Sequence, residues 1–286
     1  MNQIIKINCP DVIMIAEEST AWPKVTTAVN LGGLGFDFKW NMGWMNDTLN
    51  YVILDPIKRQ LNHNKMNFAM TYNYSERFIL PLSHDEVVHC KKPLIGKMWG
   101  EELQQFAGLR LYMTYMMGHP GKKLSFMGNE FAQRIEWREY EELQWHVLKE
   151  DILNEKTLLF FKQLNHLYKV HRALWECDFD ESGFRWVDAD NAKQSVFSFI
   201  RYAKDKSETL LFVCNFQPVL HEVFELGVPD AGEYQELFNS DLVKFGGLSR
   251  AMLDKIGTIP EWRHNCDQYI KFKLPPLSAI VLKLYG

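Results

Sequence analysis

A chain of 286 residues that is 47% hydrophobic and 24% charged has ordinary globular composition, with enough apolar side chains for a sizeable core. Its formal charge of −4 gives no reason to expect nucleic acid or an anionic membrane as partner, and no apolar run reaches transmembrane length. The five cysteines are scattered without CxxC spacing, and the histidines form no ligand-spaced cluster. We therefore predict reduced thiols, a cytoplasmic location, no metal and no cofactor.

The first 176 residues alternate between strand and helix patterns, which is typical of a parallel sheet. After a helical tail at residues 1–10, apolar runs predict strands at Val12–Ala16, Gly35–Trp40, Phe78–Ser83 and Leu124–Gly128. Apolar residues at helical spacing predict helices at Met45–Gln60, Gln104–Met117 and Ile152–Leu174. Pro81 argues mildly against a central position for the third strand, because proline cannot donate to the ladder.

After residue 176 the pattern changes to short strands separated by turn residues. The predicted strands are Phe184–Val187, Val196–Tyr202, Thr209–Asn215, Glu233–Asn239, Tyr269–Leu274 and Ala279–Leu284. The first two form a hairpin around the turn at 188–191. We expect two domains, one at residues 1–176 and an all-β domain of sandwich type at residues 177–286.

Two of the predicted strands end abruptly in acidic residues. Glu17 and Glu18 follow the first strand, and His84, Asp85 and Glu86 follow the third. Glu17 and Asp85 are 68 positions apart, close to two units of the roughly 31 residues that each β/α unit uses in an eightfold barrel. This spacing places both carboxyl groups at one face, two strands apart, as acid/base chemistry on a glycosidic bond requires. On these residues alone, Asp85 fits a helix cap equally well.

The sequence around these acids carries a specific resemblance. The segments AEEST, GGLGFDFKWNMGWMNDTLNY, YNYSERFILPLSHDEVVH and KKLSFMGNEFAQ follow one another as in the bacterial glycogen branching enzymes of the α-amylase superfamily. The resemblance implies an α/β fold: the C-terminal half (strands 5–8) of a TIM (β/α)8 barrel, followed by an all-β sandwich domain. It also implies a C-terminal fragment that lacks the strand bearing the nucleophile and has no branching activity alone.

The resemblance assigns roles to individual residues. Glu17 is similar to the general acid/base, with Glu18 as its rival, and Asp85 to the carboxylate that stabilises an oxocarbenium-like transition state. His84 resembles a donor to the hydroxyls of the same sugar, and Glu86 is interpreted as a structural cap. The remaining candidates are Trp40, Trp44, Tyr72 and Tyr74, which either stack on glucan or belong to the core, and the mouth-lining Asn129 and Glu130.

The implied reaction cleaves an α-1,4 glucosidic bond and transfers the chain to form an α-1,6 branch in glycogen, by a retaining mechanism. The implied partners are an α-1,4-glucan substrate, glycogen or amylose, and the missing N-terminal half of the enzyme. A hydrolase of the α-amylase type stays an alternative, because the same acids serve both reactions. A non-catalytic glucan-binding remnant is the other, and the absent nucleophile favours it. The flanks GGLGFDFKWN and FILPLSHDEVVH favour transfer.

Overall fold

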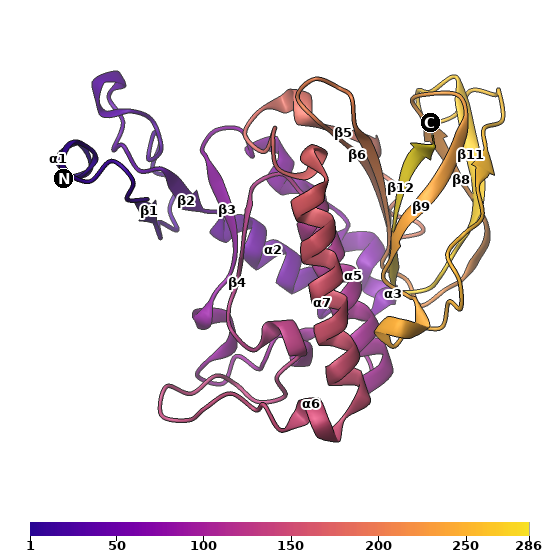
Figure 1. Cartoon of the computed structure of the whole chain (residues 1–286), viewed down its shortest axis with the longest axis horizontal. Helices are drawn as coiled ribbons and strands as arrows, with labels where there is room; N and C mark the ends of the chain where they lie inside the picture. The colour runs from indigo at the N-terminus through magenta and orange to yellow at the C-terminus, as the bar shows by residue number, and fades with distance from the viewer. Residues whose placement is uncertain (286) are drawn as a thin grey trace.

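The computed structural model describes residues 1–285, and its first layer is a four-stranded parallel sheet at the N-terminal side (Figure 1). The strands lie side by side in chain order, all parallel: β1 (Ile15–Ala16), β2 (Phe38–Trp40), β3 (Phe78–Leu82) and β4 (Lys122–Ser125). All four predicted strands are thus present, although each is shorter than its apolar run. The strand predicted to reach Gly128 ends at Ser125, and Gly128 itself adopts a left-handed turn with a φ of 92°.

Pro81 lies in β3, which is a central strand, so the expectation from proline was wrong here. Residues of alternate parity in β3 bond to opposite neighbours, and the Ile79 carbonyl accepts from the Asn41 N–H on the β2 side. Pro81 is two residues after Ile79, so its backbone nitrogen, which carries no hydrogen, also faces β2. Since β2 ends at Trp40, no strand is left on that side for Pro81 to pair with.

Seven α-helices accompany these strands within residues 1–285. They are α1 (Asn2–Asn8), α2 (Met42–Val52), α3 (Pro56–Arg59), α4 (Asn64–Asn67), α5 (Glu102–Gly118), α6 (Val147–Glu150) and α7 (Ile152–Val170). Over the same residues, no helix combines the length and the apolar character that crossing a membrane requires. The connection from β1 to β2 contains no α-helix in this part of the chain, only a 3-10 turn at Val29–Leu31.

The single helix predicted at Met45–Gln60 is wrong at both ends. The α2 helix begins earlier, because the Asn41 side chain caps it by accepting from the Trp44 N–H at 2.9 Å. It ends at Val52, and Pro56 then starts α3 with Asp55 as its N-cap. Proline cannot continue a helix that precedes it, but its fixed φ suits the first turn of a new one.

The C-terminal part forms two antiparallel sheets. Its strands are β5 (Phe184–Asp188), β6 (Val196–Tyr202), β7 (Thr209–Asn215), β8 (His221–Val228), β9 (Glu233–Asn239), β10 (Ile256–Gly257), β11 (Gln268–Leu274) and β12 (Ser278–Tyr285). Six form one sheet in the order β10-β9-β12-β7-β6-β5, and β11 pairs with β8. Buried Leu211, Phe224 and Ile270 pack between the sheets, which confirms the predicted all-β unit. Sequence reasoning missed β8 and β10.

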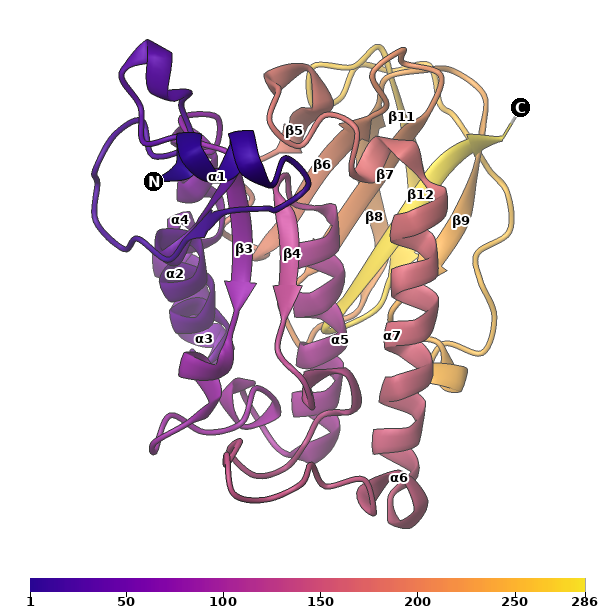
Figure 2. The ribbon, with the colours of Figure 1, turned by 60° about the vertical axis from the view of Figure 1, so that its left-hand side comes forward.

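The α5 helix lies between the two β units (Figures 1 and 2). It is buried almost all round from Phe106 to Gly118, as expected for a helix covered on every side. At Gly118 a side chain has no room, because an added Cβ would stand 2.7 Å from the Phe212 ring and 2.8 Å from the Phe199 ring. The helices and the six-stranded sheet consequently share one apolar core.

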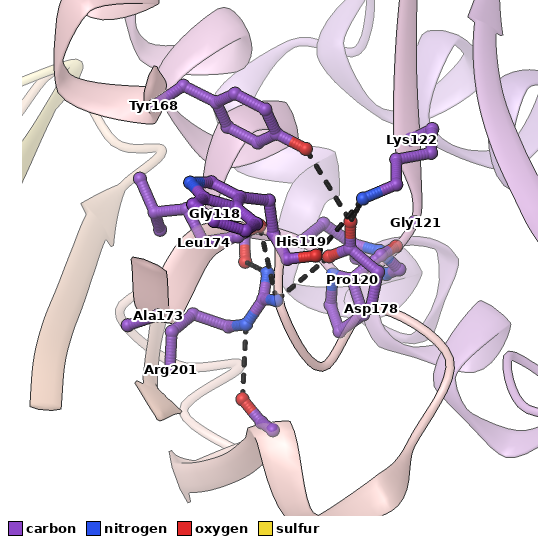
Figure 3. A network of polar contacts seen from close by, with 12 residues as sticks. Gly118, His119, Pro120, Gly121, Lys122, Tyr168, Ala173, Leu174, Asp178 and Arg201 are labelled. Atoms are coloured by element: carbon purple, nitrogen blue, oxygen red, sulfur yellow. Dashed lines mark hydrogen bonds and ion pairs between the residues drawn. The ribbon is translucent and has the colours of Figure 1, made fainter. Parts of the chain in front are cut away.

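A buried ionic network also connects the two parts (Figure 3). The Asp178 carboxylate pairs with Arg201 of β6 at 2.9 Å, and the side chains of both residues are completely buried. Lys122, the first residue of β4, pairs with the same carboxylate at 2.9 Å. Arg201 also donates to the Gly118 carbonyl at 2.8 Å and to the Gly183 carbonyl at 3.1 Å. The Asp178–Arg201 pair thus connects the parallel sheet, through Lys122, with the end of α5 and the β6 strand.

Candidate active site

The two acidic segments lie at one edge of the parallel sheet. Glu17 directly follows β1, and Asp85 follows β3 through Ser83 and His84. The strands run parallel with only β2 between them, so both carboxyl ends reach the same edge. Ala16 is in register with Lys39, and Lys39 with Phe78, so β1 ends level with the first residue of β3 and the two strand ends are staggered along the sheet. This strand arrangement is the one that the spacing predicts, and the joint action of the two acids stays a prediction.

Strand alternation separates Glu17 from its neighbour Glu18. Ala16 lies opposite Lys39 in the sheet, and side chains two apart share a face, so Glu18 points to the Lys39 side. The Lys39 ammonium meets a Glu18 carboxylate oxygen at 3.1 Å. Glu17 projects from the other face, is exposed, and has no hydrogen bond from any residue within 1–285. Its carboxyl group is therefore the one free to meet a ligand.

Glu18 is unsuited to proton donation. Its carboxylate accepts from the Thr20 backbone N–H at 2.9 Å. The Thr20 hydrogen bonds, backbone first, together with Lys39 lower the pKa of Glu18 below its ordinary value. A general acid has to hold a proton near neutral pH, whereas these contacts favour the ionised form. The geometry thus supports Glu17 in the choice that the sequence left between the two residues.

The turn after β3 is fixed by a capping box. The Ser83 N–H donates to the Glu86 carboxylate at 2.6 Å, and the Ser83 side chain accepts in return from the Glu86 backbone N–H. This confirms the interpretation of Glu86 as a cap. His84 contacts the Ser83 hydroxyl through Nδ1 at 2.9 Å and Asp85 through Nε2 at 3.3 Å. His84 and Asp85 are each 46% exposed and present an adjacent donor and carboxylate.

Removing the cap tests its role. In a Glu86→Ala variant the buried Ser83 N–H loses its acceptor, so we expect the free energy of unfolding to fall by about 1–2 kcal/mol. Glu86→Gln is the matched control, because its amide oxygen can still accept, and it should retain most of the stability. Urea denaturation of the three proteins measures this. Equal midpoints for the alanine variant and the parent would show that the box contributes nothing.

Three further candidates lie at the carboxyl edge of the sheet. Trp40 ends β2 and is half-buried. Asn129 follows β4, is 5% exposed, and its amide nitrogen has no partner within residues 1–285. Glu130 accepts from the Gly128 N–H at 2.8 Å and thereby stabilises its own turn. Contact of these residues with a substrate stays a prediction.

Two candidates are corrected. Trp44 is fully buried in the core, where its ring stacks on Tyr112 with 6.0 Å between the centroids, so it cannot stack on a glucan. Tyr74 precedes β3 and lies on the amino side of that strand, in a hollow that it lines with Glu181 and Phe184 and that neither Glu17 nor Asp85 lines. The sequence already indicated the position of Tyr74, because only residues that follow a strand reach its carboxyl end.

Sequence reasoning missed Lys39. The alternation of Phe36 and Phe38 with Asp37 and Lys39 indicates a short strand but not that Lys39 is buried, with only 5% of its surface exposed. Its ammonium group fixes the segment after β1, because it donates to the carbonyls of Thr20 at 3.0 Å and Trp22 at 3.3 Å. Within residues 1–285, no group of three or more His, Cys, Asp or Glu side chains has an arrangement that could hold a metal ion.

Comparison with known proteins places this geometry in a class. Residues 186–285 match the family described as alpha amylase, C-terminal all-beta domain. A debranching enzyme of Nostoc punctiforme superposes with a TM-score of 0.67, covering 99% of this chain and 54% of that chain at 14% identity. An alpha-amylase from H. orenii gives a TM-score of 0.61, covering 99% and 55% at 14% identity. The chain thus has the fold of α-amylase family proteins, with their all-β C-terminal domain.

The sequence comparison finds a more specific group of proteins than the structural comparison does. Over 284 residues, 99% of this chain, the sequence is 58% identical to the 1,4-alpha-glucan branching enzyme GlgB of Francisella philomiragia. This confirms the resemblance to bacterial glycogen branching enzymes over nearly the whole chain. The chain spans 44% of the length of that relative.

Proposed function

We propose that the chain acts in α-1,4-glucan branching, as part of an enzyme that cleaves an α-1,4 bond and forms an α-1,6 branch. The observation that carries this proposal is the 58% identity to a branching enzyme over 99% of the chain, together with two motif acids at one sheet edge. Because the chain spans only 44% of that relative, the complete activity needs further residues. We place the reaction in the cytoplasm, with glycogen or amylose as substrate.

We infer that residues 1–176 form strands 5–8 of a TIM barrel and that residues 177–286 form its C-terminal sandwich domain. The exposed apolar side chains next to the edge strand β1 support this: Val12, Ile13 and Ile15 are 43%, 60% and 44% exposed. Four more β/α units would cover them and pair the open edges of β1 and β4. Those units are the partner that the proposal requires.

The proposed roles follow from placement. Glu17, free of protein contacts, protonates the glycosidic oxygen as the bond breaks and later takes the proton of the acceptor hydroxyl. A nucleophilic carboxylate from the completing half forms the covalent glycosyl intermediate. The acceptor oxygen then attacks the anomeric carbon of this intermediate and displaces the carboxylate. Asp85 and His84, held by the capping box, bind the hydroxyls of the same sugar. No net change in redox state occurs: the proton that Glu17 gives leaves on the hydroxyl of the departing chain, and the proton from the acceptor hydroxyl restores the protonated form of Glu17.

The test uses the chain fused to the part of the Francisella philomiragia enzyme that it does not match. We expect the fusion to lower the absorbance of the iodine–amylose complex and to create α-1,6 linkages, and the chain alone to do neither. A rise in reducing ends without α-1,6 linkages would instead assign an amylase-type hydrolase. Saturable glycogen binding by a fully folded but inactive fusion would assign a non-catalytic glucan-binding module.

A further inference from the structure

One side chain attaches the loop after β3 to the loop after β4. Glu136 lies in the connection between β4 and α6. One of its carboxylate oxygens accepts from the Cys90 N–H at 3.0 Å, and the other accepts from the Lys92 N–H at 2.7 Å. Both donors belong to the loop of residues 88–92, which directly follows the 3-10 turn His84–Val87. A charged acceptor that binds two donors at once fixes both the position and the orientation of this loop.

The backbone of residues 88–92 is in a conformation that needs such support. His89, Cys90 and Lys92 have φ angles of 51°, 66° and 69°, in the left-handed region that side chains with a Cβ disfavour. Three such residues in four positions persist only where the surroundings hold them. The two N–H groups also lower the pKa of Glu136, so its carboxylate is ionised at neutral pH and is a strong acceptor.

The residue after Glu136 extends the contact to the turn itself. The Trp137 N–H donates at 2.9 Å to the carbonyl of Val87, the last residue of the turn. The Trp137 ring meets the Phe126 ring edge-on with 5.2 Å between the centroids, and Phe126 lies 6.0 Å from the His84 ring. Residues 136–137 therefore contact the backbone of the turn directly and support the His84 ring through Phe126.

We propose that Glu136 is a positioning residue for the candidate active site: it holds the loop after Asp85 in the conformation that places His84 and Asp85 against one sugar. The contact with a sugar rests on the proposed function, whereas the placement of His84 by Glu136 rests on these contacts alone. The capping box between Ser83 and Glu86 fixes the start of the turn, and Glu136 fixes the loop at its end.

The first test uses this chain by itself. In Glu136→Ala the loop loses two hydrogen bonds to a charged acceptor, so it opens more often, and we expect trypsin to cut between Lys91 and Lys92 at least about tenfold faster. The NMR signal of the His84 ring, identified by its loss in His84→Gln, should also move. Unchanged cleavage together with an unchanged His84 signal would overturn the proposal.

Two further variants sharpen this test. Glu139→Ala is the matched control from the same segment, because the Glu139 side chain is exposed and makes no hydrogen bond within residues 1–285, so neither readout should change. Glu136→Gln keeps the size of the side chain, but its amide offers one acceptor oxygen where the carboxylate offers two. Its cleavage rate should fall between those of the parent and Glu136→Ala. This variant also tests the proposal if the alanine variant does not fold.

The second test uses the fused enzyme at a temperature well below the melting temperature of each variant. Contacts from a carboxylate to sugar hydroxyls strengthen in the transition state, so Glu136→Ala should lower kcat about tenfold and change KM less than about twofold. A kcat equal to that of an active parent would overturn the positioning role. A fused parent without branching activity would contradict the proposed function, and the His84 signal and the cleavage rate then decide this inference without it.

Discussion

Asp178→Ala should lower the free energy of unfolding by about 3–5 kcal/mol, because it leaves buried Arg201 without its carboxylate partner. Both side chains are completely buried, so water cannot replace the lost interaction. Asp205→Ala is the matched control: this carboxylate pairs with Arg172 at 3.2 Å but is 52% exposed, and its loss should cost less than about 1 kcal/mol. Denaturant unfolding measures both. Equal losses in the two variants would contradict a structural role for the network.

The Asp178 carboxylate should also make the free energy of unfolding depend on pH. Burial alone would raise the pKa of Asp178, but Lys123, Arg201 and Lys122 outweigh it and hold the pKa below its ordinary value. A group whose pKa is depressed by folding stabilises the protein above the unfolded pKa, which is about 3.9 for aspartate. This contribution is lost as the pH falls through the lower folded value. The stability difference between the parent and Asp178→Ala should therefore shrink below about pH 4.

Glu17→Gln should lower the branching rate of the fused enzyme by about 10²–10⁴-fold, because glutamine cannot transfer the proton. Glu18→Gln is the matched control from the adjacent position. Its carboxylate is tied to Lys39 and Thr20 and faces away from the proposed site, so the rate should change far less. The initial rate of iodine-absorbance loss compares the three proteins. A larger loss in Glu18→Gln than in Glu17→Gln would reverse the assignment.

The spacing of apolar residues in the sequence predicted the sheets of this fold, because the buried side chains of a strand recur in a regular pattern along the chain. The apolar run of β3 and the alternating strands of the β unit were found within a few residues of their observed ends. The helix ends were not, since they depend on local capping by Asn41 and on the break at Pro56. β8 was missed because His221, Glu222 and Glu225 interrupt its apolar pattern.

The position of a site residue could be predicted where that residue directly follows a strand. Its burial and its partners could not be predicted, because they depend on residues that are distant in the sequence. The parallel order of the strands that Glu17 and Asp85 follow could be predicted from spacing alone. The burial of Trp44 against Tyr112 depends on α5, which is distant in sequence. The ion pair with Lys39 distinguishes Glu18 from Glu17. This pair likewise depends on which face of β2 is covered.

The most direct test of the central claim is a crystal structure of the fused enzyme with bound maltohexaose. The claim predicts that one glucose residue lies within hydrogen-bond distance of Asp85 and that the adjoining glycosidic oxygen lies within reach of Glu17. A glucan bound at this sheet edge that contacts only one of these two carboxylates would contradict it.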